Sequence, residues 1–255
     1  MRDTTLAQPR RTIEHPLLVI ERILRDREGI WRQISSEYRL NELIAQMLGS
    51  SVIALACYGI VLGSSNGILQ AISSAIKLPI LFLLTLAICL PTLYLFNLVF
   101  GARLSIQQAM ALVLTAITVT SMLTLAFAPI SLFFWITAPD YDFFKLLNVA
   151  ILALTGVVGL SFLLSGMRRM NALTAPVAPI ASPEDADAET PQRIEQPVNM
   201  SLLNLWVVLY GFVGTQLAWT LRPFFGDPGK PFEIFRSINS NFYINIIHSI
   251  MKALT

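Results

Sequence analysis

The sequence predicts an all-α membrane protein: a polytopic transmembrane helical bundle of about five spans, with amphipathic interfacial helices at both ends. Its residues are 55% hydrophobic and only 13% charged, about half the charged share of a soluble domain. The charges are also segregated. Each interval between them supplies the roughly 20 apolar residues that a spanning helix needs. Five intervals contain no Asp, Glu, Lys or Arg, namely 43–76, 78–102, 104–139, 146–167 and 196–221.

Residues 1–15 are polar and predicted to be flexible, and residues 16–40 are predicted to form an amphipathic helix. Its apolar positions recur at spacings of three, four and seven, and its other face pairs opposite charges, as in Glu28 and Arg32. A basic amphipathic helix next to a span usually lies on the membrane surface, which would place Trp31 at the depth of the lipid headgroups. The alternative is a helix that packs on a partner or on a second copy. The apolar positions are Leu17, Ile20, Leu24, Trp31, Ile34 and Tyr38.

Residues 41–170 are predicted to hold the first four spans, at about 43–62, 78–100, 109–137 and 146–164. The first ends in a Gly/Ser/Asn turn at 63–67. The second carries Pro79 near its start and Pro91 inside, where a proline tends to kink the helix. The third would be about 43 Å long if straight. Because this exceeds a hydrocarbon core of about 30 Å, tilt or a break at Pro129 is expected.

The remaining chain is predicted to be a linker, a fifth span and a C-terminal amphipathic segment. Residues 171–199 are rich in Ala, Pro and acidic residues and are expected to be disordered. Residues 200–222 form the fifth span. Residues 223–255 begin with an aromatic, turn-rich stretch and continue as an amphipathic helix. Its apolar side holds Phe242, Ile246, Ile247, Ile250 and Leu254.

The basic residues predict the orientation of the chain in the membrane. With five spans, twelve Lys and Arg residues lie on the side of the N-terminus and six lie on the opposite side. Cytoplasmic loops carry the excess of positive charge. The N-terminus and the linker are therefore predicted to be cytoplasmic, with the C-terminus on the far side.

The sequence carries no motif for catalysis, a cofactor or a metal. The two histidines lie far apart in sequence, and Cys57 and Cys89 fall within apolar spans, so a metal site is not expected. Lys77 and Lys145 each begin a predicted span and can extend to the interface. We therefore expect a protein that is not an enzyme and that has no catalytic residues or cofactors.

The polar side chains inside the spans are weakly polar and uncharged. Asn97, Asn148 and Gln216 are amides in the second, fourth and fifth spans. Such side chains hydrogen-bond between membrane helices, and closely spaced glycines allow helices to approach. The alternative is that the three amides line a polar pathway for a small solute. The paired glycines are Gly59 with Gly63, Gly156 with Gly159 and Gly211 with Gly214.

Several short motifs between residues 77 and 235 resemble those of bacterial Yip1-like membrane proteins, a group often labelled as actin-binding WH2 proteins. The resemblance implies five spans, a cytoplasmic N-terminus and no catalytic residues. No WH2-like segment follows Tyr38, so actin is not expected as a partner. The motifs are Lys77-Leu78-Pro79, Cys89-Leu90-Pro91, 94–97, 127–130, 143–148, Ala218-Trp219, 221–224 and Pro231-Phe232.

Two functions follow as hypotheses. The first is a non-catalytic membrane protein that organises or docks partners, through the N-terminal helix and the segment after the fifth span. That segment is expected to present a rigid aromatic surface. The second is a small-solute transporter or channel. The expected partners are the lipid bilayer and a protein partner or second copy, and not nucleic acid. The candidate docking residues are Arg222, Pro223, Phe224, Phe225 and Phe232.

Overall fold

The computed structural model describes residues 21–23, 25–99, 105–137, 140–174, 200–226 and 233–234, with residues 244, 247 and 251. Every element over these residues is helical, which confirms the predicted all-α class. Residues 1–15, residues 175–199 of the predicted linker and most of the predicted C-terminal helix lie outside them, whereas residues 171–174 of that linker are helical and not disordered as the sequence predicts. The elements are α2 (Arg27–Ser35), α3 (Leu40–Gly63), the 3-10 turn η1 (Ser64–Asn66), α4 (Ile68–Val99), α5 (Ile106–Ala126), α6 (Ala128–Thr137), α7 (Tyr141–Thr174) and α8 (Met200–Thr220).

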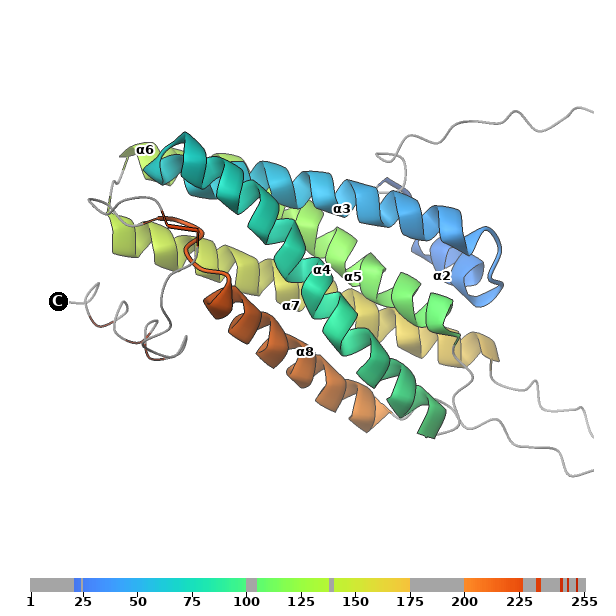
Figure 1. The fold of residues 1–255 in the computed structure, drawn as a ribbon. Helices are drawn as coiled ribbons and strands as arrows, with labels where there is room; N and C mark the ends of the chain where they lie inside the picture. The colour runs from blue at the N-terminus through green and yellow to red at the C-terminus, as the bar shows by residue number, and fades with distance from the viewer. Residues whose placement is uncertain are drawn as a thin grey trace, which may run out of the picture.

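The helices form a bundle in which α5 occupies a central place. Helix α3 packs against α4 and α5, α5 packs against α7, and α8 runs along α4 (Figure 1). The middle of α5 is buried on all sides, because residues 111–121 are enclosed by neighbouring helices. A helix that is apolar all round is typical of such an enclosed position.

Four helical stretches among the described residues are long and apolar enough to cross a bilayer. The protein is therefore a multi-pass membrane protein. Helix α8 covers the predicted fifth span but is not one of these four, so its membrane crossing stays a prediction. The four stretches are Leu40–Asn66, Ile68–Leu95, Ile106–Thr137 and Tyr141–Met170.

Two features of the spans differ in detail from the sequence prediction. The long third span is interrupted at Phe127, between α5 and α6, two residues before the proline where a break was expected. Helix α4 begins at Ile68, ten residues before the predicted start of the second span. The sequence predicts that Lys77 begins a span. Instead Lys77 lies within α4, where it is only 5% exposed.

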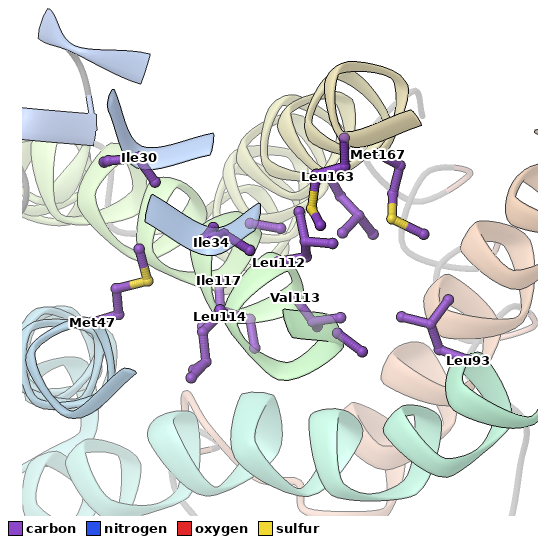
Figure 2. Close-up of a cluster of buried hydrophobic side chains, with 14 of the residues drawn as sticks. Ile30, Ile34, Met47, Leu93, Leu112, Val113, Leu114, Ile117, Leu163 and Met167 are labelled. Carbon is purple, nitrogen blue, oxygen red and sulfur yellow. The ribbon is translucent and has the colours of Figure 1, made fainter. Parts of the chain in front are cut away.

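The apolar face of α2 packs on the bundle. Ile30 and Ile34 join the main buried cluster with Met47 from α3, Leu112 from α5 and Leu163 from α7 (Figure 2). This face is thus covered by the chain's own helices, which neither sequence alternative anticipated. A period of 3.6 predicts an apolar face but not what covers it.

The surroundings of Trp31 show how closely α2 packs against α7. Trp31 is only 5% exposed, so its indole is buried against the bundle and does not face lipid as it would in a helix lying on the membrane surface. A Cβ added at Gly166 of α7 would lie 2.5 Å from the Trp31 ring, so the absence of a side chain at Gly166 makes room for the indole. Arg27 of the same helix lies over the ring of Phe162, 4.4 Å from its centroid. Helix α2 is a packed part of the fold.

Candidate functional site

The predicted docking segment follows α8 directly and folds back onto the bundle. Pro223 and Phe224 are buried, whereas Arg222 and Phe225 are half-buried. Phe224 belongs to a second apolar cluster with Tyr58, in which α3, α4, α6 and α7 take part. The ring of Phe225 packs edge-on against Phe144 of α7, with 5.9 Å between the centroids. These side chains therefore contact the same chain, and Pro223 and Phe224 do not form an exposed aromatic surface. Phe232 lies outside the described residues.

Polar side chains of the α3–α4 hairpin bind the backbone of this segment. The Nε2 of Gln70 donates to the carbonyl oxygen of Pro223 at 2.9 Å, and the hydroxyl of Ser65 donates to that of Phe225 at 3.0 Å. The hydroxyl of Ser74 donates to the carbonyl of Phe224. The segment has no regular structure, so these side chains satisfy carbonyls that would otherwise be costly to bury. We call residues 222–226 the C-terminal latch.

Lys77 of α4 also binds the backbone of the latch. Its Nζ donates to the carbonyl oxygen of Pro223 at 3.4 Å and also to the carbonyl oxygen of Ile234. A buried ammonium is costly unless hydrogen bonds replace its hydration. The carbonyls supply such bonds, and they explain how a lysine is accommodated within α4. No local sequence pattern indicates this contact, because it joins residues more than a hundred positions apart.

Arg222 lies at the junction of α8 and the latch. Its guanidinium stacks over the ring of Trp219, 3.7 Å from the centroid. Such a cation–π contact contributes about 0.5–2 kcal/mol, depending on desolvation. The stacking joins the last turn of α8 to the start of the latch.

We expect Lys77→Met to loosen the latch. Losing the hydrogen bond to the Pro223 carbonyl costs about 1 kcal/mol, which corresponds to about fivefold faster opening of the latch. Amide hydrogen exchange of the full-length protein in detergent should therefore accelerate by about that factor across residues 224–226. Lys145→Met is the matched control, because the Lys145 ammonium contacts Asp142 on its own helix. Equal exchange in the two variants would show that Lys77 does not hold the latch.

Asn148 is the centre of a buried polar cluster between three helices. Its Oδ1 accepts hydrogen bonds from the hydroxyls of Tyr58 on α3 and Ser131 on α6, each at 2.6 Å. Its Nδ2 donates to the carbonyl oxygen of Phe144 at 2.8 Å. All of Asn148, Tyr58 and Ser131 are 0% exposed. The cluster therefore satisfies its own polar atoms and joins α3, α6 and α7. We call it the Asn148 cluster.

The other two amides are not part of this cluster. Gln216 is half-buried on α8, and no hydrogen bond to its side chain is seen among the described residues. The side chain of Asn97 lies outside them. Only Asn148 of the three predicted amides therefore has a defined set of bonds between helices.

Hydroxyl pairs add further bonds between helices. The Oγ of Ser51 on α3 lies 3.0 Å from the Oγ1 of Thr118 on α5, and Thr124 and Thr155 pair at 2.9 Å between α5 and α7. Tyr58 and Ser131 were not predicted from the sequence, because neither stands out from an apolar span until the helices are assembled.

Comparison with protein-family models, curated proteins and solved structures gives no match. Among the described residues, no group of three or more His, Cys, Asp or Glu side chains is placed to hold a metal ion.

Proposed function

We propose that the protein is a non-catalytic integral membrane protein that organises or docks a partner at the membrane. The observation that carries the proposal is the charged outer face of α2 and the turn before it. This helix is fixed to the bundle by its apolar side, so its other side presents charges in a defined arrangement. Arg25 and Arg32 are 79% and 74% exposed, and each lies beside a glutamate one turn earlier.

The ion pairs on this face are available to a partner. Glu28 lies 3.7 Å from Arg32 and 3.3 Å from Arg169 of α7, so the face continues onto the end of α7. Exposed pairs of this kind contribute about 0–1 kcal/mol to folding. A binding surface can therefore exchange them for contacts with a partner at little cost to the fold. A soluble protein segment with both signs of charge is the matching partner.

The orientation of the chain is part of this proposal. Helix α2, the end of α7 and the start of α8 lie at the same end of the bundle (Figure 1). The basic residues of the N-terminal segment, together with Arg168 and Arg169, support a cytoplasmic position for this end. The opposite end, with the latch, then lies on the far side. The Yip1-like resemblance implies the same orientation.

Transport of a small polar solute is the alternative. It requires amides that face a path, whereas the polar atoms of Asn148 are bonded to Tyr58, Ser131 and Phe144. This arrangement favours a packed bundle over a polar pathway. The Asn148 cluster thus supports a membrane protein that does not conduct a polar solute.

The test is charge reversal on the outer face, in the full-length protein expressed in its own cells. Cross-linking followed by purification in mild detergent should recover one protein, or a second copy of this chain, in near-stoichiometric amount. Arg25→Glu with Arg32→Glu should reduce that recovery at least tenfold, or about 1.4 kcal/mol. Gln107→Glu is the control, because Gln107 is exposed at the same end but on α5.

Two results would overturn the docking proposal. One is a wild-type protein that yields no stoichiometric partner. The other is a partner that the double variant retains as well as the control does. Membrane abundance should be equal for all three proteins, which separates loss of docking from loss of the protein.

A further inference from the structure

A cavity of about 410 Å³ opens between α7 and α8. Helix α8 packs on α4 and α7 packs on α5, so α4 and α5 form the floor of this cavity and α7 and α8 form its walls. Its volume falls within the range of small-molecule sites, about 300–1,000 Å³. We call it the α7–α8 groove. Residues that line it include Phe82, Ile117, Leu152, Gly156, Gly211 and Gly214.

Two glycines keep the groove open. A Cβ added at Gly156 of α7 or at Gly211 of α8 would meet no atom within 4 Å. Gly159, less than one turn further along α7, is different, because a Cβ there would lie 2.6 Å from the carbonyl oxygen of Ala116 on α5. Gly159 therefore serves close packing, whereas Gly156 and Gly211 border empty space.

The walls of the groove offer hydrocarbon contacts. The hydroxyls of Thr85, Thr120 and Thr215 line it, but each donates to a carbonyl of its own helix, at 2.7, 2.9 and 2.8 Å. A cavity with few available polar groups does not hold ordered water. The fitting occupant is therefore apolar, and in a spanning region the surrounding apolar material is lipid.

Cations at one end of the groove match a phosphate. Val149 and Ala218 line the groove on opposite walls. Lys145 precedes Val149 by one turn, and Arg222 follows Ala218 by the same interval. Both belong to the end that carries the latch, as the contact between Phe144 and Phe225 shows. The Asp142 carboxylate lies 3.4 Å from the Lys145 ammonium and offsets part of its charge, whereas the Arg222 guanidinium stacks on Trp219.

We propose that the α7–α8 groove binds one acyl chain of a membrane phospholipid, whose phosphate lies at the end marked by Lys145 and Arg222. The acyl chain fills the space between α7 and α8, which form the two walls of the groove. It also completes the packing of α8, which otherwise contacts the bundle mainly through α4. This inference is independent of the docking proposal, because it concerns a different part of the molecule.

The experiment measures lipid retained by the full-length protein. Purified protein is incubated with palmitoyl-oleoyl phosphatidylglycerol in detergent and examined by native mass spectrometry. The wild type should retain one lipid per chain. Gly156→Leu and Gly211→Leu each place a side chain in the groove from opposite walls and should lower the retained fraction at least tenfold. Gly49→Leu is the control, because a Cβ there also meets no atom within 4 Å but the residue lies on α3.

Other outcomes would overturn the proposal. Equal retention by all four proteins would show that the lipid binds elsewhere. A wild-type dimer that retains no lipid and dissociates in Gly156→Leu would show that a second copy occupies the groove. Diacylglycerol with the same chains lacks the phosphate and should be retained at least tenfold less, and equal retention would remove the assignment of the phosphate. Unchanged helix content, measured by circular dichroism, verifies that each variant is folded.

Discussion

Asn148→Leu is expected to lower the free energy of unfolding by about 2–4 kcal/mol, because leucine removes the shared acceptor of two buried hydroxyls. Both Tyr58 and Ser131 donate to the Asn148 Oδ1, and both are fully buried. A stranded polar group costs about 1–3 kcal/mol. The expected loss exceeds the average of about 0.6 kcal/mol for one hydrogen bond between membrane helices, because Asn148 makes three. Denaturant or thermal unfolding in detergent micelles measures the effect.

Two controls show whether the loss belongs to the Asn148 cluster. Tyr58→Phe removes one hydrogen bond but leaves Ser131 on the Asn148 oxygen, so about 0.6 kcal/mol is expected. Gln216→Leu removes an amide whose side chain has no observed hydrogen bond among the described residues, and a change within about 0.5 kcal/mol is expected. Equal losses for Asn148→Leu and Gln216→Leu would contradict the structural role of the cluster.

The same variant separates the two functional hypotheses. If Asn148 only joins helices, activity in a complemented deletion strain should fall together with membrane abundance. If Asn148 lines a path for a solute, Asn148→Leu should abolish function at full abundance. The second result would favour the transporter alternative over the docking proposal.

The class of the fold could be predicted because the bilayer imposes it. A hydrocarbon core of about 30 Å requires long apolar runs, and these runs must be helical. The interruption near Pro129 followed from the same limit on length. The start of α4 could not be predicted, because Lys77 resembles a boundary residue when no contact partner is known. Its burial depends on carbonyls of Pro223 and Ile234, which come from the distant latch.

The candidate site was less accessible from the sequence. An amphipathic pattern places Ile30, Trp31 and Ile34 on one face of α2 but does not distinguish a lipid surface from the chain's own bundle. A Pro-Phe-Phe segment likewise indicates aromatic surface without indicating that Phe224 is buried. These distinctions depend on tertiary contacts, which a local pattern does not encode.

The glycine pairs also show that a local pattern does not encode tertiary contacts. Closely spaced glycines occur in α3, α7 and α8, and by sequence they are equivalent candidates for close helix packing. In the structure, Gly59 lies against the backbone of α4, whereas Gly156 and Gly211 border the α7–α8 groove. Substitution of these residues should therefore have very different consequences.

Gly59→Leu is expected to destabilise the protein by at least about 3 kcal/mol, at or beyond the upper end of the range for overpacking. A Cβ at Gly59 would lie 2.5 Å from the carbonyl oxygen of Ser74 and 2.8 Å from the Cα of Ala75. These are backbone atoms of α4, so no side-chain rotation can relieve the clash and the two helices must separate. Gly49→Leu makes the same change on the same helix where a Cβ meets no atom within 4 Å, and it should be close to neutral.

The clash at Gly59 should also loosen the latch. Ser74 donates to the carbonyl of Phe224, and Gln70, one turn earlier on α4, donates to that of Pro223. When α4 moves away from α3, these donors move with it, while Ser65 remains with the turn after α3. Amide exchange across residues 223–226 should therefore accelerate in Gly59→Leu and stay at the wild-type rate in Gly49→Leu. Similar unfolding and exchange in the two variants would contradict the close approach of α3 and α4, on which the anchoring of the latch depends.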